Sequence, residues 1–196
     1  MWVWEKMCSD SDEFLEIGEV LKGDVAYSAK MGLSGRLKFK TGKYKENGML
    51  IGEAKDKNLL SSTCIISLPD GISTEIRKGR SLGSSSWSIS IPVNGQDQLF
   101  EWQPMAKTLK QKLKGETGWN LLRQGGEGSE SLLAAFTDDG GSGLRSKTKM
   151  GTFEFMGAGA RGELGDAWAV IVMISVLKMK QKQVQSQMVK AIAGAA

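Results

Sequence analysis

One apolar run, residues 167–177, limits what this chain can fold into more than any other feature. It reads Ala-Trp-Ala-Val-Ile-Val-Met-Ile-Ser-Val-Leu and lies between Asp166 and Lys178. On a helix its large side chains would cover the whole circumference, so the helix must be buried on every side, in protein or in lipid. The run of 11 residues rises only about 17 Å, against a hydrocarbon core of roughly 30 Å. We therefore expect a helix in the centre of a protein core and not one that spans a membrane.

The chain before this run is divided into short apolar segments separated by turn residues. Asn94-Gly95 and Pro69-Asp70-Gly71 each predict a tight hairpin turn. About ten short strands at spacings near ten residues favour a β-sandwich or a barrel. The candidate strands are residues 25–31, 35–40, 49–54, 63–68, 72–77, 86–93, 97–103, 118–123, 131–137 and 149–156.

Residues 9–22 have a different pattern. Ser9 and Asp12 have the spacing of a capping box, and acidic residues stabilise the N-terminus of a helix. We expect a short helix here, or a loop with one helical turn.

The composition removes several classes of active site. The chain has 196 residues and no histidine, which excludes Ser-His-Asp and Cys-His nucleophile pairs and most catalytic zinc sites. Its two cysteines, Cys8 and Cys64, do not have the spacing of metal ligands, and we expect them to be reduced thiols. We therefore expect no enzymatic activity, no cofactor and no metal site.

The N-terminus indicates the expected location of the protein. Met-Trp-Val-Trp-Glu-Lys lacks the charged region and following apolar region of a signal peptide. With no segment long enough for a full-length transmembrane helix, we expect an intracellular protein, cytoplasmic or membrane-peripheral. No linker divides the chain, so a single domain over residues 1–196 is expected.

A glycine motif lies just before the apolar run. Residues 157–162 match the dinucleotide-binding pattern G-x-G-x-x-G, after a candidate strand and before a helix. That unit needs a second parallel strand and an acidic residue about 20 positions on, and the chain has no Asp or Glu after Asp166. We interpret the motif as a connection between strand and helix.

The most informative charged stretch is residues 36–45. In a strand, Arg36, Lys38 and Lys40 point to one face, and Leu37 and Phe39 to the other. One interpretation is a solvated outer face, and the other is a phosphate-binding stripe for lipid headgroups. For the second, the candidate lipid-binding residues are Arg36, Lys38, Lys40, Lys43 and Lys45.

A second basic run could extend this stripe if the fold brings the two together. It consists of Lys107, Lys110, Lys112 and Lys114. Nucleic acid is not expected as a partner, because the aromatic residues occupy core-type positions and are not interleaved with the basic ones. No small-molecule substrate is evident.

The order of several short motifs in the second half resembles one known family. They are Phe100-Glu101-Trp102, Trp119-Asn-Leu-Leu, Leu132-Leu-Ala-Ala-Phe136, Gly151-Thr-Phe-Glu-Phe155 and Glu163-Leu-Gly-Asp-Ala-Trp168, followed by the apolar run and its lysines. Together, over residues 85–190, they look like the fungal tubby C-terminal-like proteins, in the superfamily of tubby, the LURP-one-related proteins and the phospholipid scramblases.

The resemblance implies a mainly β (α+β) fold without catalysis. The expected architecture is a closed antiparallel β-barrel of about ten to twelve strands wrapped around a buried hydrophobic C-terminal helix. That helix is expected over 163–190, with 167–177 as its buried core, and with Asp166 and Lys178 marking the two mouths. No tubby headgroup motif and no scramblase calcium site can be carried over residue by residue.

Three functions remain open at this point. The leading hypothesis is a non-enzymatic domain that binds anionic phospholipid or phosphoinositide headgroups peripherally through a basic outer face. The second is a protein-interaction module that uses the 178–190 tail or the 104–117 loop, and the third is a scramblase-like membrane-associated protein.

Overall fold

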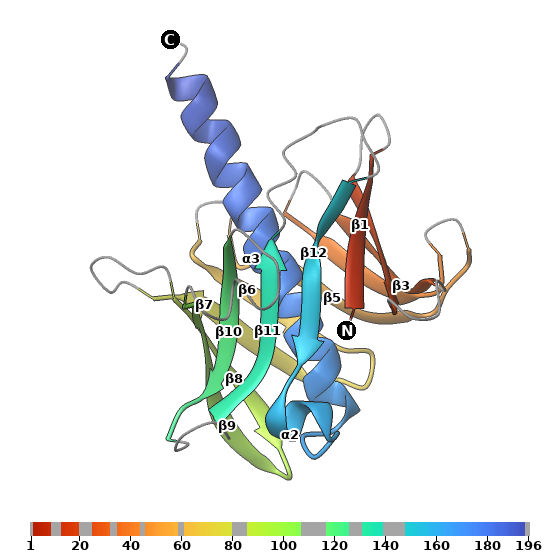
Figure 1. Cartoon of the computed structure of the whole chain (residues 1–196), viewed down its shortest axis with the longest axis vertical. Coiled ribbons are helices and arrows are strands. Elements are labelled where there is room, and N and C mark those ends of the chain that lie inside the picture. The colour runs from red at the N-terminus through yellow and green to blue at the C-terminus, as the bar shows by residue number, and fades with distance from the viewer. Residues whose placement is uncertain are drawn as a thin grey trace.

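The computed structural model describes residues 2–8, 13–19, 25–31, 35–43, 46–58, 61–79, 86–106, 117–125, 131–138 and 148–194. These contain mostly antiparallel strands, a short helix and one long C-terminal helix (Figure 1). The strands are β1 (Trp2–Cys8), β2 (Glu13–Glu19), β3 (Val25–Met31), β4 (Leu37–Thr41), β5 (Leu50–Asp56), β6 (Thr63–Ser67), β7 (Ser73–Lys78), β8 (Trp87–Val93), β9 (Gln96–Pro104), β10 (Thr117–Arg123), β11 (Leu132–Asp138) and β12 (Thr148–Phe155). The helices are α2 (Gly157–Ala160) and α3 (Asp166–Ala193).

The ten strands β3 to β12 correspond to the ten candidate strands of the sequence. They form one continuous antiparallel sheet in which each strand pairs with its neighbours in the chain. The sequence analysis expected strands of this kind to close into a barrel, and for these ten strands that prediction is wrong. β3 and β12 do not pair with each other, so the ten-strand sheet is open along these two edges.

An N-terminal hairpin covers both open edges. β2 pairs with β3, β1 pairs with β2, and β1 also pairs with β12, from Trp2 opposite Phe153 to Lys6 opposite Thr148. The hydrogen-bonded order of the strands therefore returns to its start only through residues that the sequence analysis did not assign to strands. The short helix or loop expected within residues 9–22 is wrong over Glu13–Glu19, which form β2. Pairing with the neighbouring strands β1 and β3 outweighs the local capping signals here, because it supplies hydrogen bonds along the whole segment.

Two predicted turns are confirmed. At the β8–β9 hairpin, Asn94 has φ 51° and Gly95 has φ 77°, and positive φ at both central residues is the requirement of a type I′ turn. At the β6–β7 hairpin, the Leu68 N–H donates to the Ile72 carbonyl at 2.8 Å, and Asp70 accepts the Ile72 N–H at 3.1 Å. These turns fix the register of the strands that they join.

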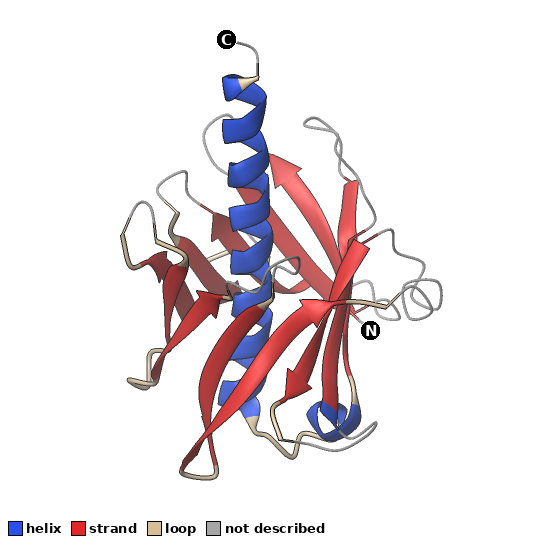
Figure 2. Cartoon of the chain, turned by 90° about the vertical axis from the view of Figure 1, so that its left-hand side faces the viewer, coloured by secondary structure: helices blue, strands red, loops and turns tan. Residues whose placement is uncertain are grey.

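The strands curve around the long helix α3, which lies along the inner side of the sheet. The C-terminal end of α3 extends past the strands (Figures 1 and 2). The helix begins at Asp166 and ends at Ala193, against the expected 163–190. Its continuously buried stretch is Ile171–Met179, whereas Ala167, Ala169 and Val170 are only partly buried. Lys178, expected at an open mouth, is instead fully buried. The buried part is therefore shifted toward the C-terminus and includes a charged residue.

Side chains from several strands hold α3 in place. The Trp102 Nε1–H donates to the Ser175 hydroxyl at 2.8 Å, and that hydroxyl donates to the Val172 carbonyl one turn earlier at 2.7 Å. On β5, a Cβ at Gly52 would come within 2.4 Å of the Ile174 side chain. A side chain at this position would therefore require the end of the Ile174 side chain to shift, so β5 and the helix pack closely here.

Candidate functional site

The predicted basic stripe lies on the outer face of β4. Leu37 and Phe39 are fully buried, while Arg36 and Lys38 are exposed and Lys40 is partly exposed. Lys43 is exposed in the segment after β4, and Lys45 lies outside the described residues. The alternation expected from the sequence therefore holds over 36–40, and the cations face away from the core.

Neighbouring strands add both cations and acids to this outer face. Lys38 lies opposite Lys30 on β3 and opposite Glu53 on β5, and Lys55 is exposed two residues beyond Glu53. The Arg36 Nε lies 3.6 Å from a Glu53 carboxylate oxygen, and both side chains are partly exposed. Ion pairs as exposed as this contribute about 0–1 kcal/mol, so Glu53 neutralises part of the stripe without closing it off.

A second group of charges, which the sequence analysis missed, lies in the interior at the C-terminal half of α3. The Asp56 carboxylate, at the end of β5, sits between two lysines one helical turn apart. Its Oδ1 lies 3.0 Å from the Lys178 Nζ, and its Oδ2 lies 2.9 Å from the Lys182 Nζ. The Cys64 thiol on β6 donates to Asp56 at 3.2 Å. We call these four residues the buried cluster.

Further contacts satisfy the buried cluster. The fully buried Lys178 ammonium donates to the Gly35 carbonyl and, at 2.8 Å, to the Gln181 side chain. Lys182 also donates to the Ser61 carbonyl at 3.2 Å. A charged ammonium in a protein interior needs both an opposite charge and hydrogen-bond acceptors, and Lys178 has both.

The protonation of the buried cluster follows from these contacts. Burial raises the pKa of Asp56, but hydrogen bonds from Lys182, Cys64 and Lys178 outweigh it, and the net pKa lies below the ordinary value. Burial lowers the pKa of Lys178, opposed by its bond to Asp56. Burial and the bond to Asp56 raise the pKa of Cys64 to about 12. A thiol with such a pKa carries almost no thiolate near neutral pH and is a poor nucleophile.

A further ion pair holds the next face of the helix. The Lys180 ammonium contacts the Asp138 carboxylate at the end of β11, and both side chains are largely buried. Lys178, Lys180 and Lys182 therefore bind acids at the ends of two strands, β5 and β11. These three lysines of the 178–190 tail, which the sequence analysis considered as a partner site, serve to anchor α3.

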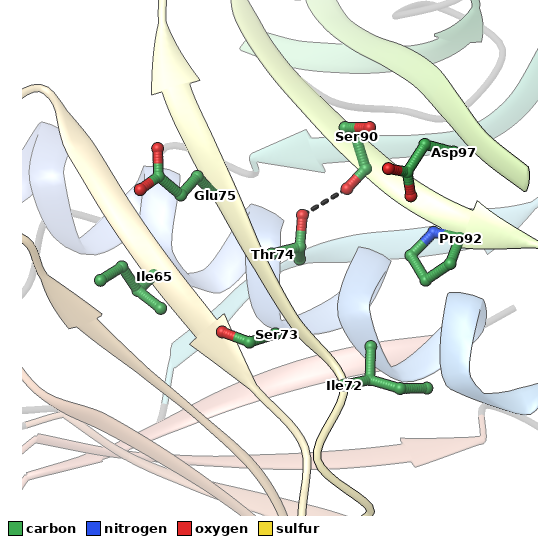
Figure 3. Close-up of a pocket in the computed structure, with 8 residues that line it drawn as sticks. All are labelled: Ile65, Ile72, Ser73, Thr74, Glu75, Ser90, Pro92 and Asp97. Atoms are coloured by element: carbon green, nitrogen blue, oxygen red, sulfur yellow. Dashed lines mark hydrogen bonds between the residues drawn. The ribbon is translucent and has the colours of Figure 1, made fainter.

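An open groove lies on the outer face where β7 and β8 diverge (Figure 3). The two strands pair only at Ile76–Lys78, and nearer the start of β7 the Thr74 hydroxyl donates to the Ser90 carbonyl in place of a backbone bond. The groove has a volume of about 420 Å³. Glu75 in its wall is already paired with Lys57 and Arg77, at 2.9 and 2.7 Å. The residues that line the groove are Ile65, Ile72, Ser73, Thr74, Glu75, Ser90, Pro92 and Asp97.

Four sequence interpretations can be compared with the structure. The glycine motif forms α2 and the turn that leads to α3, after a strand that pairs only in antiparallel fashion among the described residues. In the part of the chain that the structure describes, no three potential ligands gather around a metal position. There too, no helix is long and apolar enough to cross a membrane. The second basic run, residues 107–114, lies outside the described ranges.

Comparisons with known proteins leave the family open. No protein-family model, no curated protein sequence and no solved structure matches this chain. The likeness to tubby C-terminal-like proteins therefore stays a prediction from the order of its motifs.

Proposed function

We propose that this chain is a non-enzymatic module that binds anionic phospholipid or phosphoinositide headgroups peripherally through the outer face of β3, β4 and β5. The observation that carries the proposal is the surplus of cations on this face. Among the described residues it presents Arg36, Lys38, Lys40 and Lys55, with Glu53 as an opposing acid.

The chemistry of this face fits a fluid anionic surface better than one enclosed ligand. Its cations lie along three neighbouring strands and not around a cavity, and the groove between β7 and β8 is elsewhere and has two carboxylates in its wall. Lysines held against an anionic membrane contribute about 1 kcal/mol each, and the attraction falls within a Debye length. Binding should therefore be weak per residue, additive over the face and sensitive to salt.

Vesicle sedimentation tests the proposal. The protein should bind phosphatidylcholine vesicles that contain phosphatidylserine or a phosphoinositide, and bind less as salt rises. The double variant Lys38→Glu/Lys40→Glu should lower the partition coefficient by at least about 30-fold, because two cations at about 1 kcal/mol each are lost and repulsion is added.

A matched control reverses two exposed cations elsewhere. Lys78→Glu/Arg161→Glu changes the net charge by the same amount on β7 and after α2, and should bind nearly as the parent does. Equal binding to pure phosphatidylcholine vesicles, no binding to any vesicle, or an equal loss in both variants would rule the proposal out.

A second candidate is a protein-interaction module that uses the end of α3. The helix extends past the strands, and Val189 is exposed there (Figure 2). Truncation after Lys178 would remove the buried Met179 and the ion-paired Lys180 and Lys182, so it cannot leave the fold intact. Truncation after Gln185 keeps those contacts. A partner protein that the full chain binds and the chain truncated after Gln185 does not bind would favour this function.

A further inference from the structure

Two adjacent apolar residues are exposed where the connection from β4 enters β5. Met49 is 69% exposed and Leu50 is 37% exposed. Among the residues whose side-chain burial the structure describes, the other exposed large apolar side chains, Leu99 and Val189, lie singly on β9 and α3. Single exposed apolar residues are ordinary, whereas an adjacent pair beside a charged face is a feature to explain.

The position of this pair relative to the basic face follows from the strand register. A bulge between Phe39 and Lys40 places Lys40 opposite Leu50. Residues opposite each other in antiparallel strands point to the same side of the sheet. Leu50 therefore shares its side of the sheet with Lys40, next to Lys38.

The backbone at Met49 is held firmly. The Thr41 N–H donates to the Met49 carbonyl at 3.0 Å, and the Met49 N–H donates to the Thr41 hydroxyl at 2.9 Å. A Cβ at Gly48 would lie 1.7 Å from the Thr41 carbonyl oxygen, so the two segments approach as closely as glycine permits. Because both polar groups of the Met49 backbone are bonded, moving this residue out of water leaves no orphaned donor or acceptor.

The charges around the pair have mainly one sign. Lys38, Lys40 and Lys43 lie on β4 and just after it. Glu46 is close to Lys43, because its carboxylate accepts the Lys43 backbone N–H at 3.1 Å. Apolar side chains at the edge of a basic surface match a membrane interface, where acyl chains lie directly beneath anionic headgroups.

We infer that Met49 and Leu50 insert below the headgroups of an anionic membrane while Lys38, Lys40 and Lys43 contact the phosphates. This inference rests on the proposed function and assigns the β4–β5 edge as the part that enters the lipid. The cations govern the approach to the surface, and the apolar pair makes the bound state resist salt.

The experiment uses the full chain and vesicles of phosphatidylcholine with phosphatidylserine. Met49→Ser/Leu50→Ser removes the apolar pair without changing any charge. It should bind about tenfold more weakly than the parent, on the order expected for losing part of two buried apolar side chains. The remaining binding of this double variant should disappear at a salt concentration at which part of the parent protein is still bound. Leu99→Ser is the matched control, an exposed leucine on β9, and it should bind as the parent does.

A second measurement reports the depth of Met49 directly. In Met49→Trp, lipids brominated on the acyl chains should quench the added tryptophan fluorescence, whereas Leu99→Trp should show no added quenching. Normal binding by the serine variant, or no added quenching at position 49, overturns the insertion and leaves the basic face in place. Failure of the parent to bind anionic vesicles overturns the proposed function and the insertion with it. Both sets of residues are exposed, so urea unfolding midpoints should match the parent and confirm that each variant is folded.

Discussion

The chain uses lysine in two regions with opposite consequences. On β4, Lys38 and Lys40 lie on the outer face with water on one side. On α3, Lys178 is fully buried, and with Lys182 it holds the carboxylate of Asp56. The residue type is the same, but its surroundings decide whether the charge is available to a ligand or is paired with an acid inside the protein.

The dielectric environment explains the difference. Exposed charges are screened by water and salt, so an ion pair such as Arg36–Glu53 adds little to stability, and Arg36 can exchange Glu53 for another anion. Buried charges lose their hydration, and their mutual attraction must offset that loss. The charges of the buried cluster therefore stabilise the fold only together. Removing one member leaves its partners buried without compensation and should destabilise the protein.

The largest expected effect comes from Asp56→Ala. This change leaves the Lys178 ammonium buried without its carboxylate, and breaking such a pair costs about 3–5 kcal/mol. Urea unfolding followed by circular dichroism would measure the loss. A change below about 1 kcal/mol would mean that solvent reaches Lys178, and the distinction between the two regions would fail.

The reactivity of Cys64 tests how closed the buried cluster is. Its pKa of about 12 lies about three units above that of an ordinary thiol, so its thiolate fraction at pH 8 should be about a thousandfold lower than in the unfolded chain. In a Cys8→Ser background, a thiol reagent should label Cys64 only in urea. Labelling at equal rates with and without urea would contradict the closed arrangement.

Acid should weaken the fold through Asp56. The pKa of this carboxyl is lowered in the folded protein, so the unfolded chain takes up the proton more readily. Its stabilising contribution is therefore present above the ordinary Asp pKa of about 3.9 and is lost as the pH falls through the lower folded value. The free energy of unfolding should fall more steeply below pH of about 4 in the parent than in Asp56→Asn. Parallel pH profiles would count against the contribution of Asp56.

The smallest effect is expected on the outer face. Glu53→Ala removes the acid next to Arg36 and Lys38 and should change the free energy of unfolding by no more than about 1 kcal/mol. Because it makes the face more basic, the same variant should bind anionic vesicles more tightly than the parent. Destabilisation as large as that of Asp56→Ala, measured in the same urea titration, would show that the face has a structural role.

The two charged regions also differ in how far the sequence predicts them. The outward direction of Arg36, Lys38 and Lys40 could be predicted, because alternation along a strand is a local property. The buried cluster could not, since Asp56 and Cys64 are distant in sequence from Lys178 and nothing near Lys178 marks it as buried. The apolar pair Met49–Leu50 was read as the start of a strand, and the bulge that turns Leu50 outward depends on pairing with Lys40.

The sequence by itself determined the local elements: the strands β3 to β12, the Asn94-Gly95 and Asp70-Gly71 turns, and a helix at the C-terminus. These follow from side-chain period and turn chemistry, which act over a few residues. Only the tertiary structure decided that the ten strands stay open at β3 and β12, that β1 and β2 pair with those edges, and that the buried part of α3 extends to Lys178. The pairing of β1 with β12 and the ion pair of Lys178 with Asp56 join segments far apart in the chain, so the local preferences of the residues cannot predict them.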